Sequence, residues 1–184
     1  GALPQTQIRK LVDKEATKEN ILKASEEIFS KADDNDLVIF YYSGHGLRNG
    51  FIPYDSQNDN TVVYHEELST IFNKSKAKQK VVIADACHAG GLGYLTEKGV
   101  SSPLEDLSPS FYQKLYDTDE GYAFILSSKS RELSYEHDGL RSGVFSHFLI
   151  KGLKGKANDN GDDLINIAEL FKYTKTNVYK FTDG

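Results

Sequence analysis

Apolar side chains gather in three short runs, separated by longer stretches in which they recur at helical spacing. The runs span residues 37–42, 81–86 and 122–127, and each is almost continuously apolar. Short continuous runs of this kind predict strands of a parallel sheet that is buried on both faces. Residues 8–13 predict one further short strand ahead of these three.

Between these runs the apolar positions predict helices, because they repeat at intervals of three and four residues. The helical segments are residues 15–29, 65–73, 143–153 and 168–181. Thr17 is placed to cap the first of them. Strands that alternate with helices predict an α/β fold, in which helices cover both faces of a mostly parallel sheet.

Composition places the chain among ordinary globular proteins and sets its limits. Its 184 residues form one domain, residues 1–184, in which residues 92–120 are polar and Gly-rich and predict a long loop. A net charge of −5 argues against binding to nucleic acid. No apolar run approaches the roughly 20 residues of a membrane span, and residues 1–4 do not form a secretory leader. We therefore expect a cytoplasmic protein that acts without a membrane.

Two of the predicted strands end in residues with reactive side chains. Cys87, the only cysteine, follows the run at 81–86, and His45 follows the run at 37–42 within the sequence Ser-Gly-His-Gly. Ligands bind at the carboxyl edge of open α/β sheets, so a thiol and an imidazole there form a cysteine nucleophile with its base. Backbone amides near His45 and at Cys87 can hold an oxyanion. The alternative, in which Cys87 is only a small buried apolar residue, has less support beside such a histidine.

Asp85 precedes Cys87 by two residues, so the two side chains project to the same face of a strand. One interpretation is that its carboxylate lines a pocket for an Arg or Lys side chain. The other is that it caps the end of the strand or accepts a hydrogen bond from a loop.

Residues 158–169 are similar to a calcium-binding loop. Their candidate oxygen ligands are Asn158, Asn160, Asp162 and Glu169. The pattern has an asparagine in place of the first carboxylate, and Asp163 stands where the loop needs glycine. We therefore favour a polar turn before a helix over a metal site.

Four segments of this chain resemble motifs of the caspase-like cysteine peptidases, most closely those of metacaspases and bacterial caspase homologues. They are residues 42–46 (YSGHG), 52–55 (IPYD), 85–91 (DACHAGG) and 143–145 (GVF). The resemblance covers most of the chain and implies a caspase-like three-layer sandwich. It also implies that Cys87 attacks the scissile carbonyl, that His45 is the acid and base, and that the amides of Gly46 and Cys87 hold the oxyanion.

The resemblance further implies cleavage after Arg or Lys. Asp85 lines the S1 pocket in this scheme, and Ser127 and Glu132 are the additional candidates for that pocket. The substrates implied are proteins or peptides with basic residues, and the enzyme is a zymogen activated by proteolytic processing, in part by itself. No cofactor is implied, although calcium activates some metacaspase relatives.

Domains of this family begin with a strand and a helix that precede residues 8–13, and nothing in this chain supplies them. We therefore expect an N-terminally incomplete domain whose first strand comes from a second fragment of the same precursor. That strand is expected between residues 8–13 and 37–42. Two alternatives remain: a clostripain-like or separase-like peptidase of the same clan, and a non-catalytic caspase-like module that binds a partner.

Overall fold

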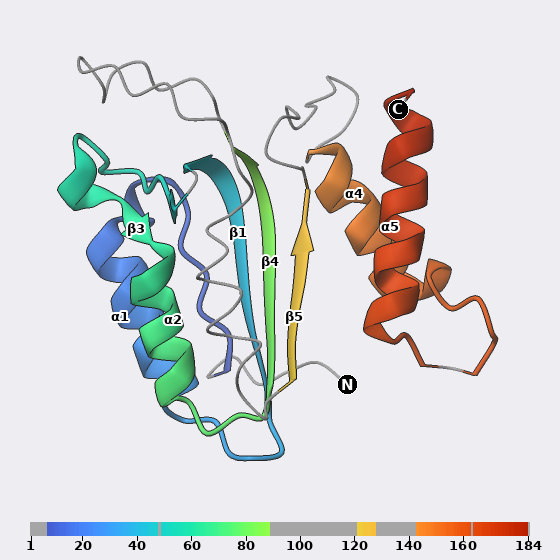
Figure 1. Cartoon of the computed structure of the whole chain (residues 1–184), viewed down its shortest axis with the longest axis horizontal. Coiled ribbons are helices and arrows are strands. Elements are labelled where there is room, and N and C mark those ends of the chain that lie inside the picture. Colours follow the sequence, from blue (N-terminus) through green and yellow to red (C-terminus); the bar gives the residue numbers. More distant parts are fainter. Residues whose placement is uncertain (1–6, 48, 89–120, 128–142, 163, 184) are drawn as a thin grey trace.

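The computed structural model describes residues 7–47, 49–88, 121–127, 143–162 and 164–183. Its sheet has the strand order β3-β2-β1-β4-β5 (Figure 1). The strands are β1 (Leu37–Leu47), β2 (Gly50–Phe51), β3 (Val63–Tyr64), β4 (Gln79–His88) and β5 (Gly121–Leu126). The helices are α1 (Lys18–Phe29), α2 (His65–Lys74), α4 (Val144–Lys151) and α5 (Ile167–Phe181), with short 3-10 turns at Asp13–Glu15 and Asp59–Thr61.

The three strands predicted from the apolar runs are confirmed as the parallel part of the sheet, β1, β4 and β5. β1 pairs with β4 from Leu37 opposite Gln79 to Gly46 opposite His88, and β4 pairs in parallel with β5. β2 and β3 are short and antiparallel, and they extend the sheet beyond the far end of β1. Because β1 and β4 are parallel, their carboxyl ends, which hold the predicted site residues, lie at the same edge of the sheet.

Helices lie on both sides of this sheet, which confirms the predicted α/β sandwich. Figure 1 shows α1 and α2 on one side and α4 and α5 on the other. Alternate strand residues fill the two cores: Val38, Phe40 and Val82 pack toward α1 and α2, whereas Ile83 and Ile125 pack toward α4 and α5. This alternation is what a strand that is buried on both faces requires.

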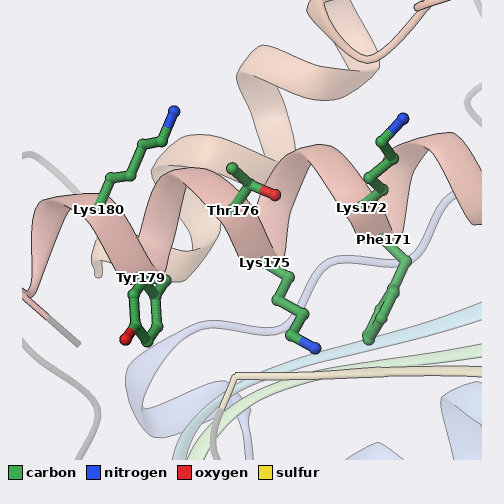
Figure 2. A pocket seen from close by; sticks show the side chains of 6 residues that line it. All are labelled: Phe171, Lys172, Lys175, Thr176, Tyr179 and Lys180. Carbon is green, nitrogen blue, oxygen red and sulfur yellow. The ribbon is translucent and has the colours of Figure 1, made fainter.

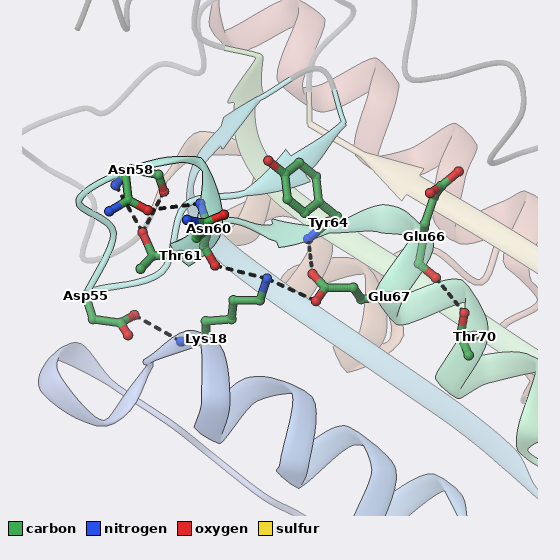
Figure 3. Close-up of polar contacts among 9 residues, drawn as sticks. All are labelled: Lys18, Asp55, Asn58, Asn60, Thr61, Tyr64, Glu66, Glu67 and Thr70. Atoms are coloured by element: carbon green, nitrogen blue, oxygen red, sulfur yellow. Dashed lines mark hydrogen bonds and ion pairs between the residues drawn. The ribbon is translucent and has the colours of Figure 1, made fainter. Parts of the chain in front are cut away.

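A polar network joins α1 to the loop after β2 and to α2 (Figure 3). Thr17 caps α1 as predicted, accepting a hydrogen bond from the Asn20 amide at 3.3 Å. Asp55 Oδ1 accepts from the Lys18 amide at 3.0 Å, and the Lys18 ammonium lies 3.0 Å from a carboxylate oxygen of Glu67. These contacts fix the two helices of this layer relative to the loop that follows β2.

The prediction of a strand at residues 8–13 was wrong. Residues 8–12 form no strand, and the chain continues into the 3-10 helix Asp13–Glu15. Ile8 is 51% exposed and Val12 is 48% exposed, so these apolar side chains do not enter a sheet core. An apolar segment becomes a strand only where a neighbouring strand pairs with its backbone.

The helix predicted at residues 143–153 ends earlier, at Lys151, and continues as a π-helical segment, Gly152–Lys156. Gly155 adopts a φ of 109° there, a conformation that glycine permits and other residues avoid. The predicted loop at 92–120 lies outside the described residues. Within the described part of the chain, no helix combines the length and apolar character that crossing a bilayer requires.

Candidate active site

His45 and Cys87 lie side by side at the carboxyl edge of the sheet. Their Cα atoms are direct partners in the parallel register of β1 and β4, and neighbouring strands are about 4.8 Å apart. His45 is exposed, so its imidazole is accessible. The structure describes Cys87 through its backbone. It brings together the two positions that the sequence singled out as nucleophile and base.

Tyr42 fixes the backbone beneath His45, a role that the sequence analysis missed. Its hydroxyl lies 2.8 Å from the His45 carbonyl and 2.7 Å from the Ile52 carbonyl, and the Ile52 amide donates to the same His45 carbonyl at 2.9 Å. The Tyr42 ring stacks on Phe51 with centroids 4.3 Å apart. Burial raises the pKa of the Tyr42 hydroxyl, which therefore stays protonated as a donor. The position of Tyr42, three residues before His45, was the one feature of the sequence that could have indicated this role.

The glycine at position 44 is required by this arrangement. A Cβ atom there would lie 2.7 Å from the Tyr42 hydroxyl oxygen, closer than such atoms approach. Gly46 is buried and is paired on both sides, with Phe51 and with His88. The predicted oxyanion donors, the amides of Gly46 and Cys87, thus belong to adjacent paired strands.

Asp85 is buried beside these residues, with only 6% of its surface exposed. The Ser146 hydroxyl, from the first turn of α4, donates a short hydrogen bond to Asp85 Oδ2. The hydroxyl oxygens of Tyr41 and Ser146 lie 2.8 Å apart. The carboxylate therefore faces the α4 side of the sheet and is held by a helix residue. Ser146 and Tyr41 belong to no local motif, so the sequence alone does not indicate their contact with Asp85.

The other predicted pocket residues have mixed outcomes. Ser127 lies just beyond β5, where its hydroxyl donates to the Ala86 carbonyl at 3.4 Å and its amide donates to the Ala84 carbonyl at 3.0 Å. These bonds place Ser127 against the last part of β4, near Asp85. Glu132 lies outside the described residues.

The loop resembling a calcium site uses its oxygens for its own turns. Asn158, Asn160 and Asp162 each accept a backbone amide from within the loop. Glu169 caps α5 by accepting from the Asn166 amide at 3.0 Å, as in a capping box. Among the described residues, no group of three or more His, Cys, Asp or Glu side chains is arranged to hold a metal. With their oxygens used in this way, these residues do not fit a calcium site.

A lysine pairs with one carboxylate of the loop. The Lys172 ammonium lies 2.6 Å from Asp159, and its hydrogen bond and positive charge lower the pKa of that carboxyl. The pair is exposed to solvent, so it contributes little to stability.

Comparison with known proteins shows the family to which this fold belongs. The family model described as "Caspase domain" matches residues 5–183. This chain therefore belongs to the caspase-domain family, as the resemblance predicted.

Three curated relatives are similar at low identity. A "Probable protease" of a Desulfuromonadales bacterium is 25% identical across 90% of this chain and 22% of its own length. The "Paracaspase" of Dictyostelium discoideum is 26% identical across 72% of this chain and 30% of its own. "Metacaspase-4" of Arabidopsis thaliana is 25% identical across 56% of this chain and 26% of its own. The chain thus spans less than a third of the length of each of these relatives.

Proposed function

We propose that this chain is the catalytic domain of a cysteine endopeptidase that cleaves after Arg or Lys with a Cys87/His45 dyad. The observation that carries the proposal is the register of β1 and β4, which makes these two residues direct neighbours. A nucleophile and its base must lie within hydrogen-bond reach, and adjacent strand ends provide that separation. The caspase-domain match and the protease and metacaspase relatives support the same chemistry.

In this mechanism His45 takes the proton of the Cys87 thiol, and the thiolate attacks the scissile carbonyl carbon. The carbonyl π electrons move to oxygen, and the C–N bond breaks as the imidazolium of His45 gives its proton to the leaving amine. His45 then takes a proton from water, whose oxygen attacks the thioester carbon. The C–S bond breaks, releasing the acid and restoring the thiol. No step requires a metal or another cofactor.

The amides of Gly46 and Cys87 are our proposed oxyanion donors. Each residue has one amide hydrogen, and both are paired across β1 and β4. For these two amides to bind the oxyanion, the last hydrogen bonds between β1 and β4 must therefore open when the substrate carbonyl enters. Stabilising the oxyanion would compensate for the lost strand bond.

Asp85 carries the proposed specificity. It is buried two residues before Cys87, and among the described residues Ser146 is its one hydrogen-bond donor. A buried carboxylate is stabilised by a cation that pairs with it, and the Arg or Lys side chain of a substrate supplies one. Ser127 lies near the same strand end, and together with Glu132 it remains a proposed member of the pocket.

A cleavage profile tests both parts of this proposal. Cys87→Ala and His45→Ala should each abolish cleavage of peptides with Arg or Lys before the scissile bond, while the circular dichroism of the protein is unchanged. Asp85→Ala should lose on the order of 2–5 kcal/mol of transition-state binding for those peptides, the value for truncating a buried charge pair. Full activity of either dyad variant would overturn the Cys87/His45 assignment, whereas a wild-type chain that cleaves none of these peptides would leave a non-catalytic caspase-like module as the explanation. A profile dominated by Asp would overturn the basic specificity.

We also propose that a further strand and helix of the same precursor cover β1. On one edge β1 pairs with β4 throughout, but on the other edge the described residues pair only at Gly46 and Leu47. Leu37, Ile39 and Tyr41 project from one face of β1 and are 50%, 50% and 49% exposed. A parallel sheet normally has both faces covered, so this edge and face are incomplete without another segment.

A further inference from the structure

Tyr41, Ser146 and Asp85 form a chain of hydrogen bonds from three separate elements. Tyr41 lies on β1, Asp85 on β4 and Ser146 in α4. The Ser146 hydroxyl reaches Asp85 Oδ2, and the Tyr41 hydroxyl lies 2.8 Å from the Ser146 oxygen. Asp85 and Ser146 are 6% and 3% exposed, so water has little access to their bond.

The direction of the protons in this chain follows from the donors available. A serine hydroxyl has one hydrogen and two lone pairs, and an ionised carboxylate only accepts. Ser146 therefore donates to Asp85, and Tyr41 must donate to Ser146. This order polarises the serine hydroxyl toward the carboxylate and strengthens the bond that Asp85 accepts.

The glycine before α4 leaves room for the carboxylate. Gly143 is the N-cap of α4, and a Cβ atom at this position would lie 2.9 Å from Asp85 Oδ2. Any other residue would push the carboxylate away from Ser146. Ser146 also occupies one carboxylate oxygen, and no described residue donates to the other, Oδ1. The arrangement thus fixes one rotamer of Asp85 and leaves Oδ1 as an acceptor.

We propose that Tyr41 and Ser146 are positioning residues that hold the Asp85 carboxylate in place for the cationic side chain of the substrate. This inference rests on the proposed function and adds to it the residues that determine how strongly a basic side chain is preferred. Tyr41 and Ser146 act through Asp85 and do not touch the substrate. Their removal should reduce the preference for a cation without disabling the Cys87/His45 chemistry.

The test compares two fluorogenic peptides that differ only before the scissile bond, where one has arginine and the other has citrulline, its neutral isostere. Variants are made in the full-length protein, and the ratio of kcat/KM for arginine over citrulline is measured. Ser146→Ala should lower this ratio about tenfold, the effect of losing one hydrogen bond to a charge. Ser146→Thr keeps the hydroxyl and should restore the ratio, and Tyr41→Phe should lower it about threefold.

Two controls separate positioning from general damage. Ser25→Ala removes another buried hydroxyl, which bonds to the Ile21 carbonyl within α1 on the opposite face of the sheet, and should leave the ratio unchanged. The rate at which iodoacetamide alkylates Cys87 reports the state of the dyad, and it should be equal in wild type and in Ser146→Ala. If Ser146→Ala does not fold, Tyr41→Phe carries the test.

A wild-type preference for arginine that survives unchanged in Ser146→Ala and Tyr41→Phe would overturn this inference and leave the proposed specificity standing. A wild-type enzyme that cleaves both peptides equally would instead overturn the basic specificity itself, and this inference with it. A lower ratio with normal alkylation would support both.

Discussion

At the scale of single residues, Tyr42 connects the β2 segment to the proposed base. Its hydroxyl contacts the carbonyls of His45 and Ile52, which belong to different parts of the chain. The Ile52 amide is a second donor to the His45 carbonyl. His45 therefore stands on a backbone that is held from two directions, which is how a base keeps its position relative to a nucleophile.

Tyr42→Phe should reduce kcat more than it raises KM, because His45 would lose part of its support while the substrate pocket is kept. The free energy of unfolding should fall by about 1–2 kcal/mol, the effect of leaving a carbonyl without its donor. Tyr54→Phe is the matched control, since Tyr54 follows in the same segment and is 66% exposed. Urea unfolding and cleavage kinetics measure both effects, and equal behaviour of the two variants would contradict the proposed role.

Tyr42 also predicts how stability depends on pH. Burial raises its pKa in the folded state above the ordinary value of 10.0, so the folded protein holds this proton more tightly than the unfolded chain does. The resulting stabilisation is complete below pH 10 and is lost as the pH rises through the folded-state pKa. The free energy of unfolding should therefore decline above pH 10, and Tyr42→Phe should decline less steeply. Denaturant titrations at a series of alkaline pH values would show parallel slopes if this explanation is wrong.

At the scale of elements, α1 is fixed by the segment that the family resemblance identified at residues 52–55. Asp55 accepts from the first amide of α1, at Lys18, and the Tyr54 amide donates to the Ala16 carbonyl at 2.9 Å. Thr17, the N-cap residue, caps the same helix with its own side chain. A carboxylate at a helix N-terminus satisfies an unpaired donor and interacts favourably with the helix dipole. The aspartate of this motif thus has a structural role in the described residues.

Asp55→Ala should destabilise the protein by about 1 kcal/mol, the usual effect of removing a helix cap. Asp34→Ala is the control: Asp34 is exposed and its carboxylate lies 3.7 Å from the Lys78 ammonium, an arrangement that contributes about 0–1 kcal/mol. Thermal unfolding of both variants measures the difference. A loss of peptide cleavage in Asp55→Ala without a change in melting temperature would instead place Asp55 in the active site.

At the scale of the whole molecule, the described helices lie on both sides of the sheet, α1 and α2 on one side and α4 and α5 on the other (Figure 1). On β1 the side chains of Leu37, Ile39 and Tyr41 are half exposed. An aromatic and basic groove lies on α5, lined by Phe171, Lys172, Lys175, Thr176, Tyr179 and Lys180. Figure 2 shows Phe171, Lys175 and Tyr179 pointing to one side of α5 and the other three residues to the opposite side. These exposed apolar side chains on a strand and on a helix are the basis of the proposal that another segment covers β1.

Hydrogen exchange tests this proposal within a single strand. Because the His45 carbonyl accepts from Ile52 on the open edge, the backbone groups of Ile39 and Tyr41 point to that edge, and those of Phe40 point to β4. In the 184-residue chain alone, the amides of Ile39 and Tyr41 should exchange much faster than that of Phe40. In the longer protein all three should be protected. Equal protection in the isolated chain would show that the edge is already covered.

The sequence by itself determined the three parallel strands of the sheet and the positions of the candidate site residues at the ends of two of them. Continuous apolar runs mark strands that are buried on both faces, and His45, Asp85 and Cys87 stand where two of these runs end. Such signals are local, because each depends on residues that are adjacent in the chain. The strand predicted at residues 8–13 failed for the same reason: a local pattern does not show whether a partner strand is present.

Only the tertiary structure decided what surrounds these residues. The register places His45 beside Cys87, and Ser146 reaches Asp85 across 61 positions of sequence. The Tyr42 hydroxyl contacts the Ile52 carbonyl, ten positions later in the sequence, because the chain turns back after β1. Hydrogen bonds between distant residues leave no periodic trace in a sequence, because they depend on how strands and helices pack and not on their individual propensities.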